Sequence, residues 1–144
     1  MTTRTSSGSR TRILVGFDGS ETAMRALGRA ADEIAPGGTL TLLTVEPMAH
    51  SPGVLSEDLL SASPDAAALL EEARLSLGTR DDIAIEPIVR KGDPAALMLE
   101  AARDTGADLI VIGRRGRDFA ARALLGSVAE RVVSQAPCDV LVVA

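Results

Sequence analysis

Five short apolar runs, separated by stretches with helical spacing, constrain this chain more than any other feature of its sequence. Apolar runs bounded by turn residues are typical of buried strands, and apolar residues three and four positions apart are typical of helices. Alternating strands and helices predict a mostly parallel sheet with helices on both faces. We predict the strands at residues 13–17, 39–46, 83–90, 108–112 and 139–143.

The segments between these runs carry helix start and stop signals. Ser20 is a typical cap of a first helix, which the Pro36-Gly37-Gly38 sequence should stop. Ser63-Pro64-Asp65 predicts the start of a second helix, and Asp93-Pro94 that of a third. The fourth helix is expected at Ser127–Ser134.

The order of the strands follows from one proline. Pro87 lies inside the third strand, and proline cannot donate to a central ladder, so this strand should be at an edge. With right-handed crossovers, the open, twisted, five-stranded sheet should have the order 3-2-1-4-5. Ligands of such sheets bind beyond the carboxyl ends of the strands where the order reverses, here strands 1 and 4. Asp18 and Gly113 follow those two strands.

A glycine motif begins at the end of the fourth strand. It comprises Gly113, Gly116, Gly126 and Ser127, in the pattern G-x2-G-x9-G-S, and its last two residues open a helix. Glycine lets backbone N–H groups approach a ligand closely, and a helix N-terminus favours negative charge. The motif therefore predicts a phosphate site, although glycines at these positions could also serve turn geometry alone.

Composition excludes several classes of function. The 144 residues suit one domain, and the net charge of −5 with only 1% aromatic residues argues against nucleic acid and an anionic membrane. Cys138 and His50 are the only cysteine and histidine, so neither a disulfide within the chain nor a zinc site is expected. Lys91 is the only lysine among many arginines, which favours a GC-rich bacterial genome.

The beginning of the chain is polar. Residues 1–11 are rich in serine, threonine and arginine and are expected to form a disordered tail, before a single domain at 12–144. The tail does not have the pattern of a secretory signal, and no apolar run reaches membrane-spanning length, so the expected location is cytoplasmic.

Residues 12–144 resemble the universal stress protein family, and in particular its ATP-binding subgroup. The resemblance rests on the full glycine motif and on the segments I-L-V-G-F-D-G-S, L-L-T-V-E, K-G-D-P and A-P-C-D-V-L-V-V. It implies a Rossmann-like fold of the adenine nucleotide alpha hydrolase-like type. It also implies that Asp18 and the Phe17 backbone hold the adenosine end, beside Val45.

The same resemblance places the phosphates of ATP, with Mg²⁺ or Mn²⁺, at the glycine motif. The nucleotide-binding residues that it implies are Phe17, Asp18, Val45, Gly113, Arg115, Gly116, Gly126, Ser127 and Val128. A homodimer is implied through the last strand, at Val140, Leu141, Val142 and Val143. Several positions depart from the family pattern: Arg114 replaces a small hydroxyl residue, Thr44 a common histidine and Asp139 a common proline or serine. The loop between Gly116 and Gly126 is also poorer in glycine than in many relatives.

The expected function is regulatory: ATP occupancy would change the conformation of the protein or its choice of partner. No Walker A sequence is present and no general base is evident, so we assign no catalytic residue. A slow ATPase and an interaction dimer without nucleotide are the alternatives. The residues do not distinguish ATP from another adenine nucleotide such as cyclic AMP.

Overall fold

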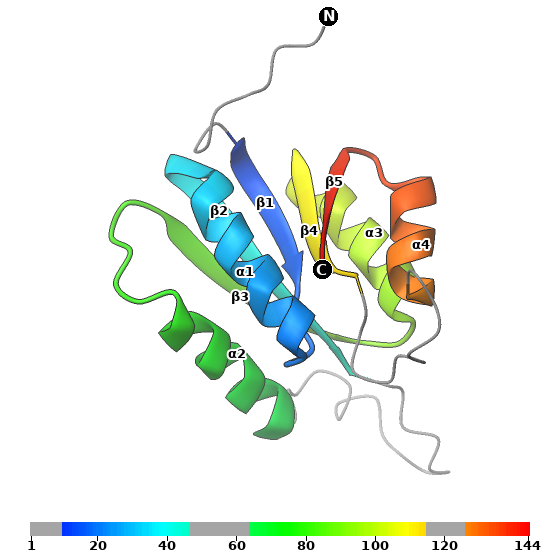
Figure 1. The fold of residues 1–144 in the computed structure, drawn as a ribbon, viewed down its shortest axis with the longest axis horizontal. Helices are drawn as coiled ribbons and strands as arrows, with labels where there is room; N and C mark the ends of the chain where they lie inside the picture. The colour runs from blue at the N-terminus through cyan, green and yellow to red at the C-terminus, as the bar shows by residue number, and fades with distance from the viewer. Residues whose placement is uncertain (1–9, 47–63, 115–125) are drawn as a thin grey trace, which may run out of the picture.

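A parallel sheet of five strands forms the centre of the molecule, in the predicted order β3-β2-β1-β4-β5 (Figure 1). The structure, a computed structural model, describes residues 10–46, 64–114 and 126–144. The strands are β1 (Arg10–Gly16), β2 (Ile34–Glu46), β3 (Ala84–Lys91), β4 (Leu109–Gly113) and β5 (Asp139–Val143). The helices are α1 (Glu21–Glu33), α2 (Pro64–Ser76), α3 (Pro94–Thr105) and α4 (Ser127–Gln135). None of the helices in these ranges has the length and apolar character needed to cross a membrane.

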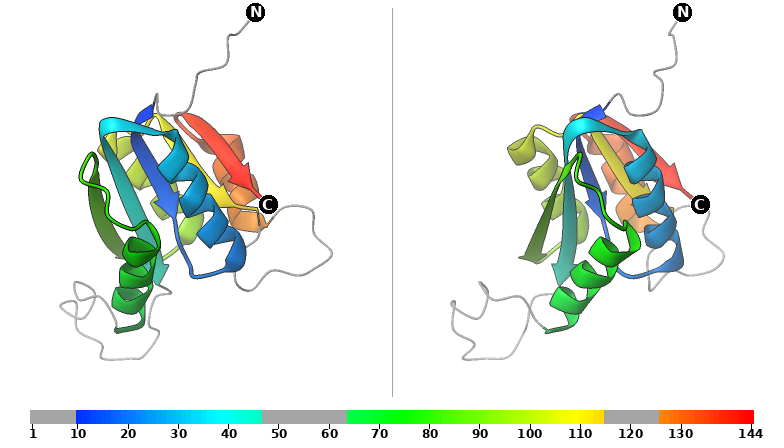
Figure 2. Two further views of the ribbon diagram at one scale, coloured as in Figure 1. Left: turned by 60° about the vertical axis from the view of Figure 1, so that its left-hand side comes forward. Right: turned by 90° about the vertical axis from the view of Figure 1, so that its left-hand side faces the viewer.

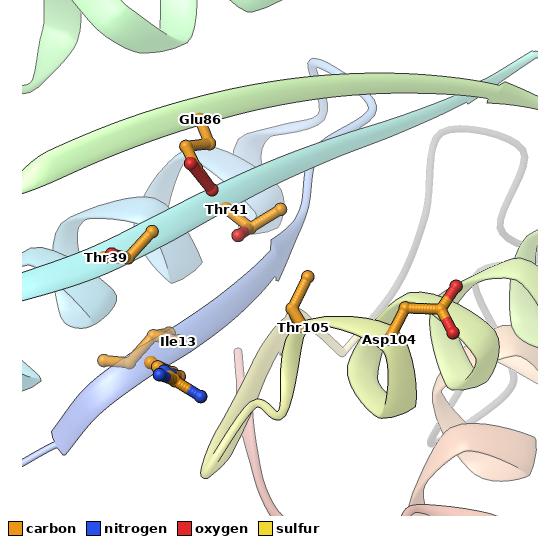
Figure 3. Close-up of a pocket in the computed structure, with 7 residues that line it drawn as sticks. Ile13, Thr39, Thr41, Glu86, Asp104 and Thr105 are labelled. Atoms are coloured by element: carbon orange, nitrogen blue, oxygen red, sulfur yellow. The ribbon is translucent and has the colours of Figure 1, made fainter.

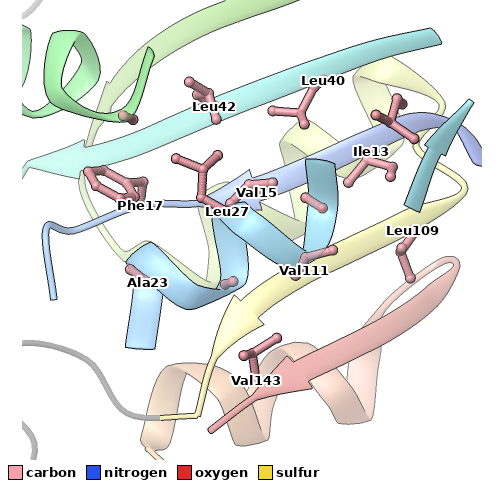
Figure 4. Packing of buried hydrophobic residues seen from close by; sticks show 14 residues of the cluster. Ile13, Val15, Phe17, Ala23, Leu27, Leu40, Leu42, Leu109, Val111 and Val143 are labelled. Carbon is pink, nitrogen blue, oxygen red and sulfur yellow. The ribbon is translucent and has the colours of Figure 1, made fainter. Parts of the chain in front are cut away.

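The helices cover both faces of the sheet, with α1 and α2 on one side and α3 and α4 on the other (Figure 2). Successive strand residues point to opposite faces, which divides the apolar core in two. The core on the α1 side includes Ile13, Val15, Phe17, Leu27, Leu40, Leu42, Leu109 and Val111 (Figure 4). The core on the α3 side includes Leu14, Leu43, Met98, Leu99, Ile110, Ile112 and Val132. Aliphatic side chains therefore fill the interior, as the near absence of aromatic residues requires.

All four helices begin at their predicted positions, and the caps of α1, α3 and α4 differ. The Ser20 hydroxyl accepts from the Ala23 amide at 3.2 Å at the start of α1. The Asp93 carboxylate accepts from the Ala96 amide at 3.0 Å at the start of α3. Helix α4 follows Gly126 and has no side-chain cap. Its first amides therefore lack the partner that the other two helices have.

The edges of the sheet agree with the proline argument. Among the described strands, β3 pairs with β2 alone, and Pro87 lies opposite Leu42 in the register. Strand β5 forms the other edge and pairs with β4. Strand β1 lies between β2 and β4 and is parallel to both. Its carboxyl end is thus the place where the strand order reverses.

Two boundaries differ from the sequence prediction. Helix α1 ends at Glu33 and β2 starts at once, so the Pro36-Gly37-Gly38 sequence lies within the strand and not between helix and strand. The register there jumps from Arg10–Ile34 to Arg12–Thr39, which marks an irregular start of the β1–β2 ladder. The Gly37 amide donates to the Asp82 carbonyl at 2.6 Å with Gly37 at φ +86°, a conformation that favours glycine.

Strand β1 also begins at Arg10, before the predicted start at residue 13. One carboxylate oxygen of Asp108 accepts from the Thr11 amide at 3.0 Å, the Thr11 hydroxyl at 3.1 Å and the Arg12 amide at 3.2 Å. These bonds hold the first residues of β1 beside β4. The rest of the expected tail, residues 1–9, lies outside the described residues.

Candidate functional site

The predicted ligand site lies at the carboxyl ends of β1, β2 and β4. Because these strands are parallel, their carboxyl ends meet at the same end of the sheet. Asp18 lies just after β1, Val45 is the second-last residue of β2, and Gly113 is the last residue of β4. The chain places these residues on neighbouring strands although they are far apart in sequence. This edge is the usual ligand position of an open α/β sheet.

The end of β1 is fixed against β2 by two hydrogen bonds. The Phe17 amide donates to the Leu43 carbonyl at 2.9 Å, and the Thr44 hydroxyl donates to the Phe17 carbonyl at 3.0 Å. The Phe17 side chain is buried in the core below α1. Both backbone groups of Phe17 therefore already have partners within the protein, which leaves only a second lone pair of its carbonyl for a ligand.

Asp18 begins the turn from β1 into α1. Its Oδ1 accepts from the Ser20 amide at 2.9 Å, an arrangement typical of an Asx turn. Gly19 between them has φ +82°, a backbone conformation that glycine adopts without steric cost. The half-buried Asp18 carboxylate is thus held at the edge of the sheet, with its orientation fixed by the turn.

Gly113 ends β4 against the first turn of α1. A Cβ on Gly113 would lie 2.9 Å from the carbonyl carbon of Thr22 and 2.9 Å from its Cβ, closer than real side chains pack. Thr22 itself is buried, at 6% exposure. The first glycine of the motif therefore has a packing role that the sequence did not reveal, because only the fold brings α1 to this strand.

The two described ends of the glycine motif meet at Arg114. The Arg114 carbonyl accepts from the Gly126 amide at 2.9 Å, and the Arg114 amide donates to the Val143 carbonyl at 2.7 Å. The Nε of Arg114 is buried and has no hydrogen-bond partner among the described residues. Gly113 and Gly126 thus lie at the same end of the sheet, as a shared ligand site requires.

Helix α4 starts at this junction. Ser127 is exposed, whereas Val128 is half-buried and packs against the core on the α3 side. Gly126 has φ −66° and ψ 155°, which any residue can adopt, so its lack of a side chain is not explained by backbone strain. Arg115 and Gly116 lie outside the described residues, so their predicted contacts remain predictions.

The described residues contain no group of three or more histidine, cysteine, aspartate or glutamate side chains that could hold a metal ion. A polar groove of about 370 Å³ opens elsewhere, at the amino ends of β1 and β2 (Figure 3). Its lining includes Arg12, Thr39, Thr41, Glu86 and Thr105. Because it lies at the opposite ends of the strands, this groove is separate from the predicted site.

The fold and the ligand edge define a Rossmann-like α/β protein with a glycine motif between β4 and α4. The chain belongs to the universal stress protein family, whose model matches residues 9–144. The assignment made from the motif and the short segments is thereby confirmed.

Relatives of known sequence and structure agree. A universal stress protein of Thermus aquaticus is 35% identical over 137 residues, which cover 91% of this chain and 96% of that protein. The solved structure of the universal stress protein UspA from Lactobacillus plantarum has a TM-score of 0.76 at 28% identity, over 93% of this chain and 97% of that one. A universal stress protein solved in complex with cAMP has a TM-score of 0.67 at 28% identity, over 94% and 98%.

Proposed function

We propose that this chain is a cytoplasmic regulatory protein that binds an adenine nucleotide, and that occupancy changes its conformation or its choice of partner. The observation that carries the proposal is the start of α4. This helix begins without a side-chain cap, beside the carboxyl end of β4. The amide of Gly126, the residue before the helix, donates a hydrogen bond to the Arg114 carbonyl. The first-turn amides and the positive end of the helix dipole at this end of the sheet favour a phosphate group.

The phosphate end of the proposed site consists of Gly126, Ser127 and Val128. The first-turn amides would donate to phosphate oxygens, and the exposed Ser127 hydroxyl can add another donor. The backbone conformation of Gly126 does not require glycine. In the proposal, the absence of a side chain there instead leaves room for the anion. Arg115 and Gly116 complete this end in the proposal.

The adenosine end consists of Asp18, the Phe17 backbone and Val45, which packs against the core on the α3 side. The Asp18 carboxylate can accept hydrogen bonds from the nucleoside, and Val45 offers an apolar wall. The universal stress protein solved with cAMP supports an adenine nucleotide as the class of ligand. We propose ATP as the nucleotide, with Mg²⁺ or Mn²⁺ bound through phosphate oxygens.

Two further expectations remain proposals. Strand β5 pairs only with β4 among the described strands, and we propose that its outer edge at Val140–Val143 forms a homodimer. Light scattering of the purified protein would show twice the chain mass. A slow ATPase is the competing function, and formation of ADP by the purified protein would support it.

The decisive experiment places a carboxylate at the start of α4. In Gly126→Asp the new side chain can cap the helix by accepting from its own first-turn amides, so it competes with phosphate. We expect the variant without ligand to be as stable as the wild type or slightly more so, and to bind ATP at least about tenfold more weakly. Calorimetric titration with ATP and thermal unfolding measure the two effects.

Gly126→Ala and adenosine are the controls. Alanine adds bulk without a charge or a cap, so it should weaken ATP binding less than aspartate does. Adenosine has no phosphate and should bind Gly126→Asp and the wild type equally. An aspartate variant that binds ATP as tightly as the wild type would show that the phosphates are not at α4.

A further inference from the structure

We propose that Thr44 is a positioning residue for the adenosine end of the site: its hydroxyl holds the end of β1 against the end of β2 and thereby fixes the separation of Asp18 and Val45. This inference rests on the proposed nucleotide function. It concerns a residue that departs from the family pattern, where histidine is common at this position.

The hydrogen bond that carries the inference is buried. Thr44 is 3% exposed, and its hydroxyl donates to the Phe17 carbonyl at 3.0 Å across the two strands. The register of β1 with β2 ends at Gly16 opposite Leu43, so this bond lies just beyond the ladder. Together with the bond from the Phe17 amide to Leu43, it fixes Phe17 on both sides of its backbone.

The position of Asp18 depends on that anchor. Phe17 is the last residue before the turn and is 2% exposed, so its buried side chain holds it in place together with its backbone bonds. The carboxylate of Asp18 is in turn oriented by the Ser20 amide at 2.9 Å. The peptide that joins Phe17 to Asp18 therefore sets where the carboxylate stands relative to β2.

Val45 directly follows Thr44, so the same side chain connects the two walls of the proposed adenosine end. Without the hydroxyl, a buried carbonyl would lose a partner, and such a group moves toward any other available donor. The expected consequence is a shift of the Phe17–Asp18 peptide relative to Val45. A nucleoside that bridges the walls would then bind more weakly, whereas a phosphate group at α4 would be unaffected.

The test compares Thr44→Val, which keeps the shape but removes the hydroxyl, with Thr44→Ser, which keeps the hydroxyl. Thr41→Val is the matched control, since Thr41 is also 3% exposed on β2 but makes no bond to the end of β1. Calorimetric titrations use adenosine and inorganic triphosphate, at a temperature where far-ultraviolet circular dichroism shows every variant folded.

We expect Thr44→Val to bind adenosine about tenfold more weakly and triphosphate as the wild type does, which corresponds to the loss of one oriented hydrogen bond. Thr44→Ser and Thr41→Val should retain wild-type affinity for both ligands. An unchanged adenosine affinity in Thr44→Val, or an equal loss for triphosphate, would overturn the positioning role alone. A wild-type protein that binds neither adenosine nor ATP would instead refute the proposed function on which it rests.

Discussion

Substitution of Gly113 by alanine tests whether the first motif glycine is required for packing. The added Cβ would overlap the Thr22 Oγ1 and would lie 2.9 Å from both the Cβ and the backbone carbonyl carbon of Thr22, so the clash is with the main chain of α1 as well as with a side chain. The φ of Gly113 is not positive, so alanine is compatible with the backbone. An alanine in a compatible conformation normally stabilises a protein by about 0.4–1 kcal/mol, so a loss of stability must come from the contact.

The size of the loss follows from what has to move. Overpacking of a well-packed site costs about 1–3 kcal/mol, and a backbone obstacle places this variant at the upper end, at about 3 kcal/mol. For a domain of this length, that corresponds to a thermal midpoint about 10 °C below the wild type. Differential scanning calorimetry measures the midpoint, and urea titration measures the free energy of unfolding independently.

Gly16→Ala is the control for this experiment. Its Cβ would overlap the end of the Met98 side chain, which has three rotatable bonds and can move aside, and would make an ordinary contact of 3.5 Å with Ile112. This variant should lose less than about 1 kcal/mol. If Gly113→Ala melted within about 2 °C of the wild type, or if both alanine variants lost the same stability, the packing role of Gly113 against Thr22 would be refuted.

Two further predictions concern the amino ends of β4 and β5. Asp108→Ala removes the acceptor of three hydrogen bonds from Thr11 and Arg12 and should lower the free energy of unfolding by about 2 kcal/mol. Asp104→Ala is the control, because Asp104 is exposed and its loss should leave the free energy of unfolding unchanged. Equal urea midpoints for the two variants would contradict this prediction. Burial, followed by the carboxylates of Asp139 and Asp108, raises the pKa of the Cys138 thiol above its usual 9.0. The rate of alkylation by iodoacetamide should therefore rise at a higher pH in the native than in the urea-unfolded protein. The folded state favours the neutral thiol, so this contribution to stability is present below the unfolded pKa and is lost as the pH rises through the folded one. Coincident alkylation profiles would disprove the shift.

The sequence was sufficient to predict the strand order and the end of the sheet at which the candidate site residues meet. Pro87 identified an edge strand, and the apolar runs alternated with helical segments, so few topologies remained. The positions of Asp18, Gly113 and Gly126 at one end of the sheet followed from that topology. These features depend on local patterns and on general rules of chirality, which a single sequence contains.

Other features depend on contacts between distant residues and could not be predicted. The start of β1 at Arg10 depends on a carboxylate from Asp108, and the early start of β2 on a bond between Gly37 and Asp82. The close approach of Thr22 to Gly113 arises only when α1 packs on the sheet. No periodicity or motif encodes which polar group will meet which, so boundaries and packing roles had to come from the structure.

The backbone of Arg114 connects the start of α4 to the end of β5. Its carbonyl is bonded to the residue that opens α4, and its amide to the carbonyl of Val143 at the end of the outermost strand. A movement of Gly126 relative to the sheet must stretch a contact of 2.9 Å or displace Arg114, and displacement of Arg114 strains the contact of 2.7 Å with Val143. The start of α4 and the edge strand β5 are therefore mechanically linked through the backbone of one residue, Arg114, and its amide proton is a natural reporter of events at either place.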